Sequence, residues 1–200
     1  MKTKPEATVK WLWMTIDGPY SYLVYLPSDY DSNPEKRHPV IYWLHGGGGA
    51  QRTGEYFVKD YSEALKSGQA PAAILILVNG VGGSLFCDSF DGRKPVETVI
   101  INDLIPHIDA SYRTLAKREA RGVEGFSMGG FGAAHFGFKY PELFGVISIL
   151  APALLGPDVP GEGLQRKWSA LFAAALGNDL DYFKANNPFD LVVKNAARLR

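Results

Sequence analysis

The sequence predicts a mainly parallel α/β sheet that is covered by helices on both of its faces. Four short apolar runs are typical of strands that are buried on both sides, because their hydrophobic residues are continuous rather than alternating with polar ones. Helical periodicity fills the stretches between them, and such an alternation folds as a parallel sheet flanked by helices. The four runs are Val40–Leu44, Ala72–Val78, Gly122–Phe126 and Val146–Leu150.

Two β-rich stretches precede the first buried run. The residues from Thr8 to Thr15 and from Tyr20 to Leu26 are rich in β-branched and aromatic side chains, and Asp17-Gly18-Pro19 between them is a strong turn signal. We therefore expect an antiparallel hairpin that adds to one side of the sheet.

Helices are predicted between the strands and after the last of them. An amphipathic pattern covers the first two of these segments, and the second is expected to kink at Pro106. The last segment is interrupted at Asn187-Pro188. In chain order the predicted helices are Tyr56–Lys66, Val96–Ile108, Ser127–Lys139, Leu164–Leu176 and Tyr182–Arg200.

Composition limits the class of protein. A chain of 200 residues with 46% hydrophobic and 21% charged residues is expected to form a single domain, residues 1–200. Its formal net charge of zero gives no reason to expect nucleic acid or a membrane surface as a partner. No apolar run approaches the ~18–20 residues of a membrane span, and no signal peptide is visible. We expect a cytoplasmic protein or a fragment of a secreted one.

The strongest functional pattern is Gly125-Phe126-Ser127-Met128-Gly129, a G-x-S-x-G sequence between a predicted strand and a predicted helix. This is the setting of a nucleophile elbow, in which a serine occupies a strained turn and flanking glycines let the backbone close. The pattern predicts Ser127 as a nucleophile and the N–H of Met128 as one donor to an oxyanion. A plain glycine-rich turn is the alternative.

A second pattern, His45-Gly46-Gly47-Gly48-Gly49, directly follows the buried run Val40–Leu44. It matches the oxyanion loop of esterases, in which glycines let a backbone N–H turn toward a carbonyl oxygen; a loop that only reverses the chain is the alternative. His45 is expected to brace this loop rather than to act as a base. We count His45 and Gly46 as substrate-binding candidates, together with Asn79 at the same edge of the sheet.

Other groups that could carry chemistry give weaker patterns. Cys87 has no base near it in the sequence, so we expect an incidental thiol. Asp88 and Asp91 lack an EF-hand pattern, and we predict no metal site. Four aromatic residues are candidates either for an acyl pocket or for the ordinary core, namely Phe86, Phe90, Phe131 and Trp168.

Five motifs occur in order along the chain: His45–Gly49, Asp103–Ile108, Tyr112–Thr114, Gly125–Ala133 and Tyr140–Phe144. Their combination resembles the esterase D family of α/β-hydrolases. This family includes feruloyl and acetyl xylan esterases, S-formylglutathione hydrolases and mycolyltransferases. The resemblance covers the chain from Val9 to Leu191.

The resemblance implies an α/β-hydrolase fold with Ser127 as the nucleophile and with no cofactor. It also implies an oxyanion hole formed by the N–H of Met128 and an N–H of the preceding glycine loop, assigned to Gly47. In relatives, the stretch similar to Asn187–Leu191 is followed by two further strands and a last helix that carry the acid and the histidine. This sequence ends at Arg200, so we expect the C-terminal strands to be missing from its fold.

A triad in this fold follows the chain order serine, acid, histidine, and only His135 follows Ser127. His135 lies on the same predicted helix, about 12 Å away at ~1.5 Å per residue, which is too far to accept the serine proton. His38 and His107 are expected at the surface or as caps. No triad acid or base is assigned, and four aspartates are interpreted as solvated or helix-capping: Asp158, Asp179, Asp181 and Asp190.

Three functions remain open at this point. The first is a serine carboxylic ester hydrolase that acts on a small-molecule or carbohydrate-linked ester, with feruloyl and acetyl esters as examples. The second is an acyltransferase, in which a hydroxyl group replaces water. The third is a hydrolase-fold scaffold or binding module with weak activity or none.

The run Val146–Leu150 carries a prediction about assembly. Without further strands it would lie at the edge of the sheet with apolar side chains on both faces, and such edges invite pairing with another chain. We therefore expect a homo-oligomer that covers this edge.

Overall fold

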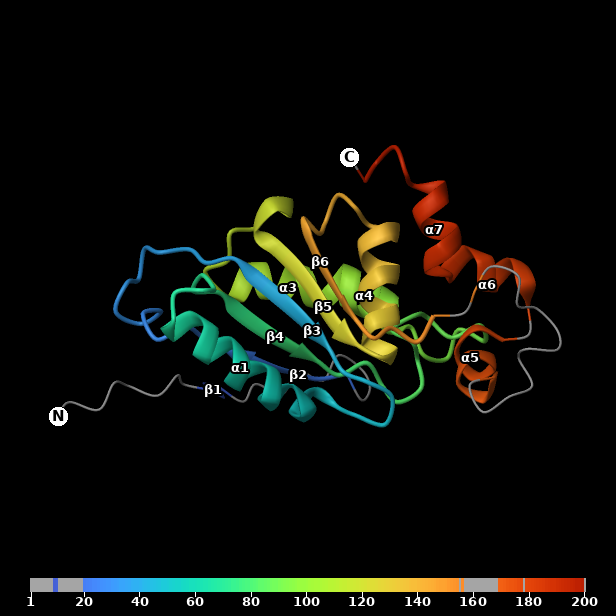
Figure 1. Cartoon of the computed structure of the whole chain (residues 1–200), viewed down its shortest axis with the longest axis horizontal. Coiled ribbons are helices and arrows are strands. Elements are labelled where there is room, and N and C mark those ends of the chain that lie inside the picture. The colour runs from blue at the N-terminus through green and yellow to red at the C-terminus, as the bar shows by residue number, and fades with distance from the viewer. Residues whose placement is uncertain (1–8, 11–19, 155, 157–168, 178, 200) are drawn as a thin grey trace.

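The computed structural model describes residues 9–10, 20–154, 156, 169–177 and 179–199. Its centre is one six-stranded sheet. The strands are β1 (Val9–Lys10), β2 (Tyr22–Tyr25), β3 (Val40–Leu44), β4 (Ile74–Val78), β5 (Arg121–Phe126) and β6 (Val146–Leu150). They lie side by side in the order β1-β2-β4-β3-β5-β6 (Figure 1). The last four strands of this order run parallel to one another, whereas β2 is antiparallel to both β1 and β4.

The mainly parallel sheet expected from the sequence is confirmed. The antiparallel pairing of the N-terminal segments is confirmed for β1, whose two residues pair with Tyr25 and Val24. The predicted turn Asp17-Gly18-Pro19 lies outside the described residues.

Alternate residues of β4 divide the hydrophobic core between the two faces of the sheet. Leu75 and Leu77 pack on Phe57 of α1 (Glu55–Lys66), which covers one face. The other side chains of the strand enter the larger cluster on the opposite face. Every residue of the strand is therefore buried, which explains why its apolar run is continuous. The residues on the second face are Ile74, Ile76 and Val78.

A continuous helical stretch over residues 96–111 covers part of this second face. The N–H of Ile105 bonds the carbonyl oxygen of Ile100, five residues earlier, in the turn just before Pro106. Proline lacks an N–H and crowds the preceding turn, so the disturbance predicted at Pro106 takes the form of a π-helical turn. The stretch consists of α2 (Val96–Thr98), the π-helical segment η2 (Val99–Leu104) and α3 (Ile105–Ser111).

In the described part of the chain, four further helices come after Ser127, and α6 and α7 lie beside α4 (Figure 1). The predicted interruption at Asn187-Pro188 is confirmed, since Asn187 separates α6 from α7, which begins at Pro188. The capping role of Asp179 is confirmed, since its side chain accepts a hydrogen bond from the N–H of Tyr182 at 2.7 Å, whereas Asp158 lies outside the described residues. None of the described helices is both long and apolar enough to span a membrane. The four are α4 (Met128–Lys139), α5 (Ser169–Leu176), α6 (Leu180–Asn186) and α7 (Pro188–Lys194).

The edge strand β6 exposes apolar side chains, as the sequence predicted. Val146 is 60% exposed and Leu150 is 45% exposed. A groove lies beside this strand on the face of α1, lined in part by Ile41, Tyr61 and Gly122. Apolar surface next to unpaired strand edges favours association.

We therefore expect the protein to form dimers that the substitution Val146→Lys dissociates, because a charge at the edge disfavours strand pairing. Light scattering coupled to gel filtration would measure the mass of each form. Val193→Lys is the matched control, because Val193 is a 77% exposed valine on α7. A wild-type protein that stays monomeric at all concentrations tested would contradict the expectation.

Candidate active site

Ser127 lies at a sharp turn between β5 and α4. Its backbone has φ 56° and ψ −111°, a strained conformation for a residue other than glycine. The main chain holds it there, since its N–H bonds the carbonyl oxygen of Leu150 at 3.0 Å. Its own carbonyl oxygen accepts the N–H groups of Phe131 and Ala153 at 3.0 and 2.9 Å. The side chain is half-buried, at the carboxyl end of the sheet.

The glycines on either side let this turn close. A Cβ at Gly129 would overlap with the carbonyl oxygen of Leu44 and lie 2.8 Å from that of His45. A Cβ at Gly125 would overlap with the carbonyl oxygen of Gly129. The strand, the turn and the first turn of α4 thus touch backbone to backbone, as the nucleophile-elbow pattern predicts.

The loop after β3 is held by the imidazole of His45, which is fully buried. Its Nε2 accepts the N–H of Gly80 at 3.0 Å, so its Nδ1 carries the proton and donates to the carbonyl oxygen of Gly46 at 2.8 Å. Burial also lowers the pKa of His45, which favours this neutral form. The bracing role expected of His45 is therefore seen. Both ring nitrogens bond the main chain. A role of His45 in binding substrate stays a prediction.

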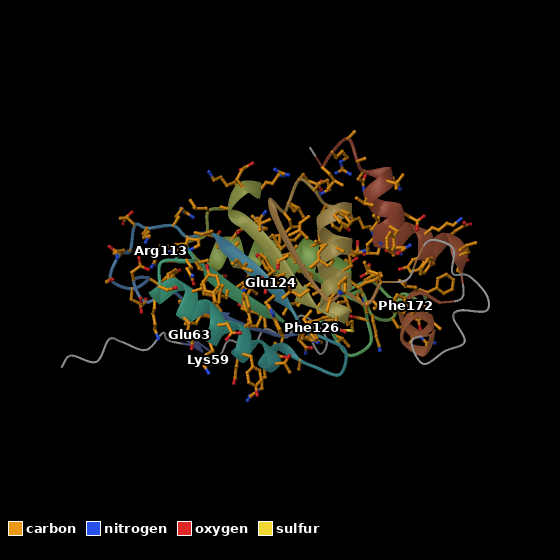
Figure 2. The ribbon with its side chains drawn as sticks, viewed as in Figure 1. Lys59, Glu63, Arg113, Glu124, Phe126 and Phe172 are labelled. Carbon is orange, nitrogen blue, oxygen red and sulfur yellow. The ribbon has the colours of Figure 1, made fainter. Side chains whose placement is uncertain are left out.

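The structure brings the predicted oxyanion donors together. Leu44 and Gly125 are partners in the β3–β5 ladder, so the residues that follow each strand are neighbours. A Cβ at Gly47 would lie 4.0 Å from the Cβ of Met128. Phe126, at the end of β5, is 52% exposed beside this loop, and Figure 2 shows Glu124 further back on the same strand.

Asn79 follows β4 at the same edge. Its N–H donates to the carbonyl oxygen of Ser21 at 2.9 Å, and its side-chain carbonyl oxygen accepts the N–H of Val81 at 3.3 Å. Asn79 therefore fixes the start of the loop that follows β4. Its role in binding substrate stays a prediction.

All four histidines have positions that keep them from Ser127. His38 precedes β3, at the opposite end of the sheet, and is buried rather than at the surface as expected. His107, on α3, bonds the hydroxyl of Tyr22 at 3.0 Å. His45 braces its loop, and His135 belongs to a buried ionic network on the far side of α4.

That network joins α4 to α2 and α6. The Nδ1 of His135 donates to the carbonyl oxygen of Asn186 at 2.8 Å, and its Nε2 lies 2.9 Å from Oε2 of Glu97. The other oxygen of Glu97 accepts from the hydroxyl of Tyr140 and from the ammonium of Lys139, the latter at 2.7 Å. Burial alone would raise the pKa of Glu97, but these partners hold it well below its usual value. Burial alone would lower the pKa of His135, but the neighbouring thiol and carboxylate raise it.

Cys87 completes a group of three potential metal ligands with Glu97 and His135. Their ligand atoms lie within 4.8 Å of one another. Both nitrogens of the imidazole and both oxygens of the carboxylate already have protein partners, however, and Lys139 adds a positive charge. We therefore interpret the group as an ion-pair network. The carboxylate of Asp88 is likewise engaged, by the N–H and the hydroxyl of Thr98.

The chain is similar to proteins of a known family. Residues 14–200 match the family model described as "Putative esterase". The chain belongs to this esterase family. A curated esterase of Mycobacterium tuberculosis is 38% identical over 159 residues, which are 76% of this chain and 33% of the relative. A xylanase/feruloyl esterase of Xylanibacter ruminicola is 27% identical over 143 residues, 68% of this chain and 20% of that protein. The chain thus spans about a third of the length of the first relative and about a fifth of the length of the second.

Solved structures show that this esterase-family chain has an α/β-hydrolase fold. A fluorophosphonate-binding serine hydrolase of Staphylococcus aureus superimposes with a TM-score of 0.73 at 18% identity, covering 94% of this chain and 74% of that one. A ferulic acid esterase of Anaeromyces mucronatus gives a TM-score of 0.63 at 25% identity, covering 81% of this chain and 64% of that one. The resemblance found in the sequence is therefore confirmed.

Proposed function

We propose that this protein is a serine carboxylic ester hydrolase with Ser127 as its nucleophile. The observation that carries the proposal is the conformation of Ser127, which holds a half-buried serine in a strained turn at the start of α4. The first N–H groups of a helix have no acceptor within the helix, so they point at the place where negative charge would form. Membership of the esterase family agrees with this assignment.

In the proposed reaction the oxygen of Ser127 attacks the ester carbonyl carbon and loses its proton. The N–H groups of Gly47 and Met128 stabilise the oxyanion of the tetrahedral intermediate. The bond between the carbonyl carbon and the alcohol oxygen then breaks, and the alcohol takes up the proton that Ser127 lost. Water hydrolyses the acyl-enzyme to release the acid and restore the serine. We assign no residue of this sequence as the base, because His38 precedes β3 at the opposite end of the sheet and the other three histidines have hydrogen-bond partners elsewhere.

Feruloyl esters are the substrates we propose to test first. Two relatives are named as feruloyl or ferulic acid esterases, and small acetyl esters serve as a less selective comparison. Of the aromatic candidates for an acyl pocket, Phe86 and Phe131 are fully buried and belong to the core, whereas Phe90 is 52% exposed. Trp168 lies outside the described residues.

A scaffold without activity is the second candidate function. The observation that favours it is that no described hydrogen bond joins a histidine to the side chain of Ser127. Oxyanion stabilisation and binding alone still give ~10³–10⁴-fold catalysis over water in serine hydrolases. Slow turnover therefore does not distinguish the two functions, but covalent labelling of the serine does.

We expect a fluorophosphonate probe to label the wild-type protein and to leave Ser127→Ala unlabelled, because the probe reacts only with an activated serine. Hydrolysis of p-nitrophenyl acetate and of methyl ferulate should fall at least ~100-fold in the same variant. Ser67→Ala is the matched control, because it removes an exposed hydroxyl at the C-terminal end of α1. An unlabelled wild-type protein would favour the scaffold, and equal labelling of Ser127→Ala would exclude Ser127.

A further inference from the structure

The peptide group between Gly46 and Gly47 is fixed through its carbonyl oxygen. That oxygen accepts hydrogen bonds from Nδ1 of His45 at 2.8 Å and from the N–H of Gly49 at 3.0 Å. A trans peptide is planar, so its N–H points away from its C=O. The two donors that hold the carbonyl oxygen of Gly46 therefore also set the direction of the N–H of Gly47, the proposed oxyanion donor.

Two main-chain groups constrain the tautomer of His45. The carbonyl oxygen of Gly46 can only accept, so the contact with Nδ1 requires a proton on that nitrogen. The N–H of Gly80, from the loop after β4, donates to Nε2 at 3.0 Å. A backbone N–H cannot accept a hydrogen bond, so this contact obliges Nε2 to be the unprotonated nitrogen. The position of Gly80 therefore favours the tautomer in which Nδ1 donates to Gly46.

The ring of Phe86 holds Gly80 in place. A Cβ at Gly80 would overlap with this ring, lying 2.8 Å from its Cδ1 and still closer to its outer edge. On another side the same side chain contacts Gly132 of α4, where a Cβ would lie 2.8 Å from the Cβ of Phe86. The ring also packs edge-on against His45, with the centroids 5.3 Å apart. Phe86 therefore contacts His45, Gly80 and α4, the helix that follows Ser127.

The backbone around Phe86 is strained and cross-linked. Leu85 and Phe86 have φ values of 57° and 59°, a conformation that side chains other than glycine rarely adopt. The hydroxyl of Ser84 donates to the carbonyl oxygen of Gly80 and accepts the N–H of Phe86, the latter at 3.0 Å. Such strain persists only where the surroundings impose it, and it concentrates at functional sites.

We propose that Phe86 is a positioning residue for the oxyanion hole, acting through Gly80 and His45 on the peptide that carries the N–H of Gly47. This inference rests on the proposed function, because it assigns Phe86 a part in the same site. The ring does not touch substrate. It holds the imidazole of His45 in the tautomer that carries its proton on Nδ1. This tautomer in turn orients the peptide group between Gly46 and Gly47.

The test combines a kinetic and a spectroscopic measurement on Phe86→Leu, with Phe189→Leu as the matched control, because Phe189 is a 41% exposed phenylalanine on α7. The rate of fluorophosphonate labelling should fall about tenfold or more in Phe86→Leu, since loss of a whole oxyanion donor costs about 10²–10³-fold. ¹⁵N spectra of the histidine rings, assigned with His45→Asn, should show only Nδ1–H for His45 in wild type and Phe189→Leu. Phe86→Leu should show a mixture of the two tautomers.

The two measurements separate the inference from the proposed function. If wild-type protein is not labelled, the proposed function fails, and the tautomer of His45 alone decides whether Phe86 positions it. Ser84→Ala is the second variant if Phe86→Leu does not fold, because it keeps the ring but cuts its link to Gly80. A folded variant that retains the wild-type labelling rate, or a tautomer unchanged from wild type, would overturn the inference.

Discussion

The substitution Gly129→Ala is expected to reduce fluorophosphonate labelling of Ser127 at least ~100-fold and to lower the melting temperature. The new Cβ would overlap with the carbonyl oxygen of Leu44 and lie 2.8 Å from that of His45, so α4 has to move away from the end of β3. Backbone has no alternative rotamer that could relieve this overlap. A displacement of about 1 Å at a reacting group can cost ~10²-fold in rate.

The stability effect of Gly129→Ala should be at the upper end of overpacking, about 1–3 kcal/mol. For a chain of this size, about 3 kcal/mol is a fall of about 6–12 °C in melting temperature, measurable by differential scanning calorimetry. Gly82→Ala is the matched control, because a Cβ there meets nothing within 4 Å. Equal labelling of both variants would show that the close contact between α4 and β3 is not required for reactivity.

The substitution Glu97→Gln is expected to destabilise the protein by about 3–5 kcal/mol, because it leaves buried cationic groups without their counter-ion. Glu97 lies 2.9 Å from the imidazole of His135 and 2.7 Å from the ammonium of Lys139. The melting temperature should fall on the order of 10 °C. Glu142→Gln is the matched control, since the ion pair of Glu142 with Arg198 is half-exposed and such pairs contribute about 0–1 kcal/mol.

The pH dependence of stability should follow the same network. The pKa of Glu97 is lowered on folding, so its contribution is present above the ordinary value of 4.5 and is lost as pH falls through the folded pKa. The pKa of His135 is raised, so its contribution is complete below 6.5 and is lost as pH rises toward the folded pKa. Stability from the pair is therefore greatest between pH 4.5 and 6.5.

Calorimetric scans across pH would check both the substitution and the linkage. The difference in melting temperature between wild type and Glu97→Gln should shrink at acid pH, because Glu97 of the wild type then takes up a proton itself. If Glu97→Gln costs no more than Glu142→Gln at pH 6, the interpretation of the cluster as a stabilising ionic network is wrong.

The sequence by itself determined the sheet and the place of the elbow. Continuous apolar runs favour strands of a parallel sheet, and β3 and β6 begin and end at the residues that the pattern predicts, although β6 is exposed at the edge. The spacing of the glycines in Gly125–Gly129 likewise fixed where a strand meets a helix. These features depend on local periodicity and on small side chains, which are visible residue by residue.

Only the tertiary structure decided which distant groups meet. His135 and Cys87 showed no partner in the sequence, because Glu97 reaches them from another helix across the core. Phe86 looked like an ordinary core aromatic, because neither its positive φ nor its contact with Gly80 leaves a local signal. Contacts between segments far apart in the chain depend on how β4, α2 and α4 pack, and packing follows from the whole sequence rather than from any one stretch of it.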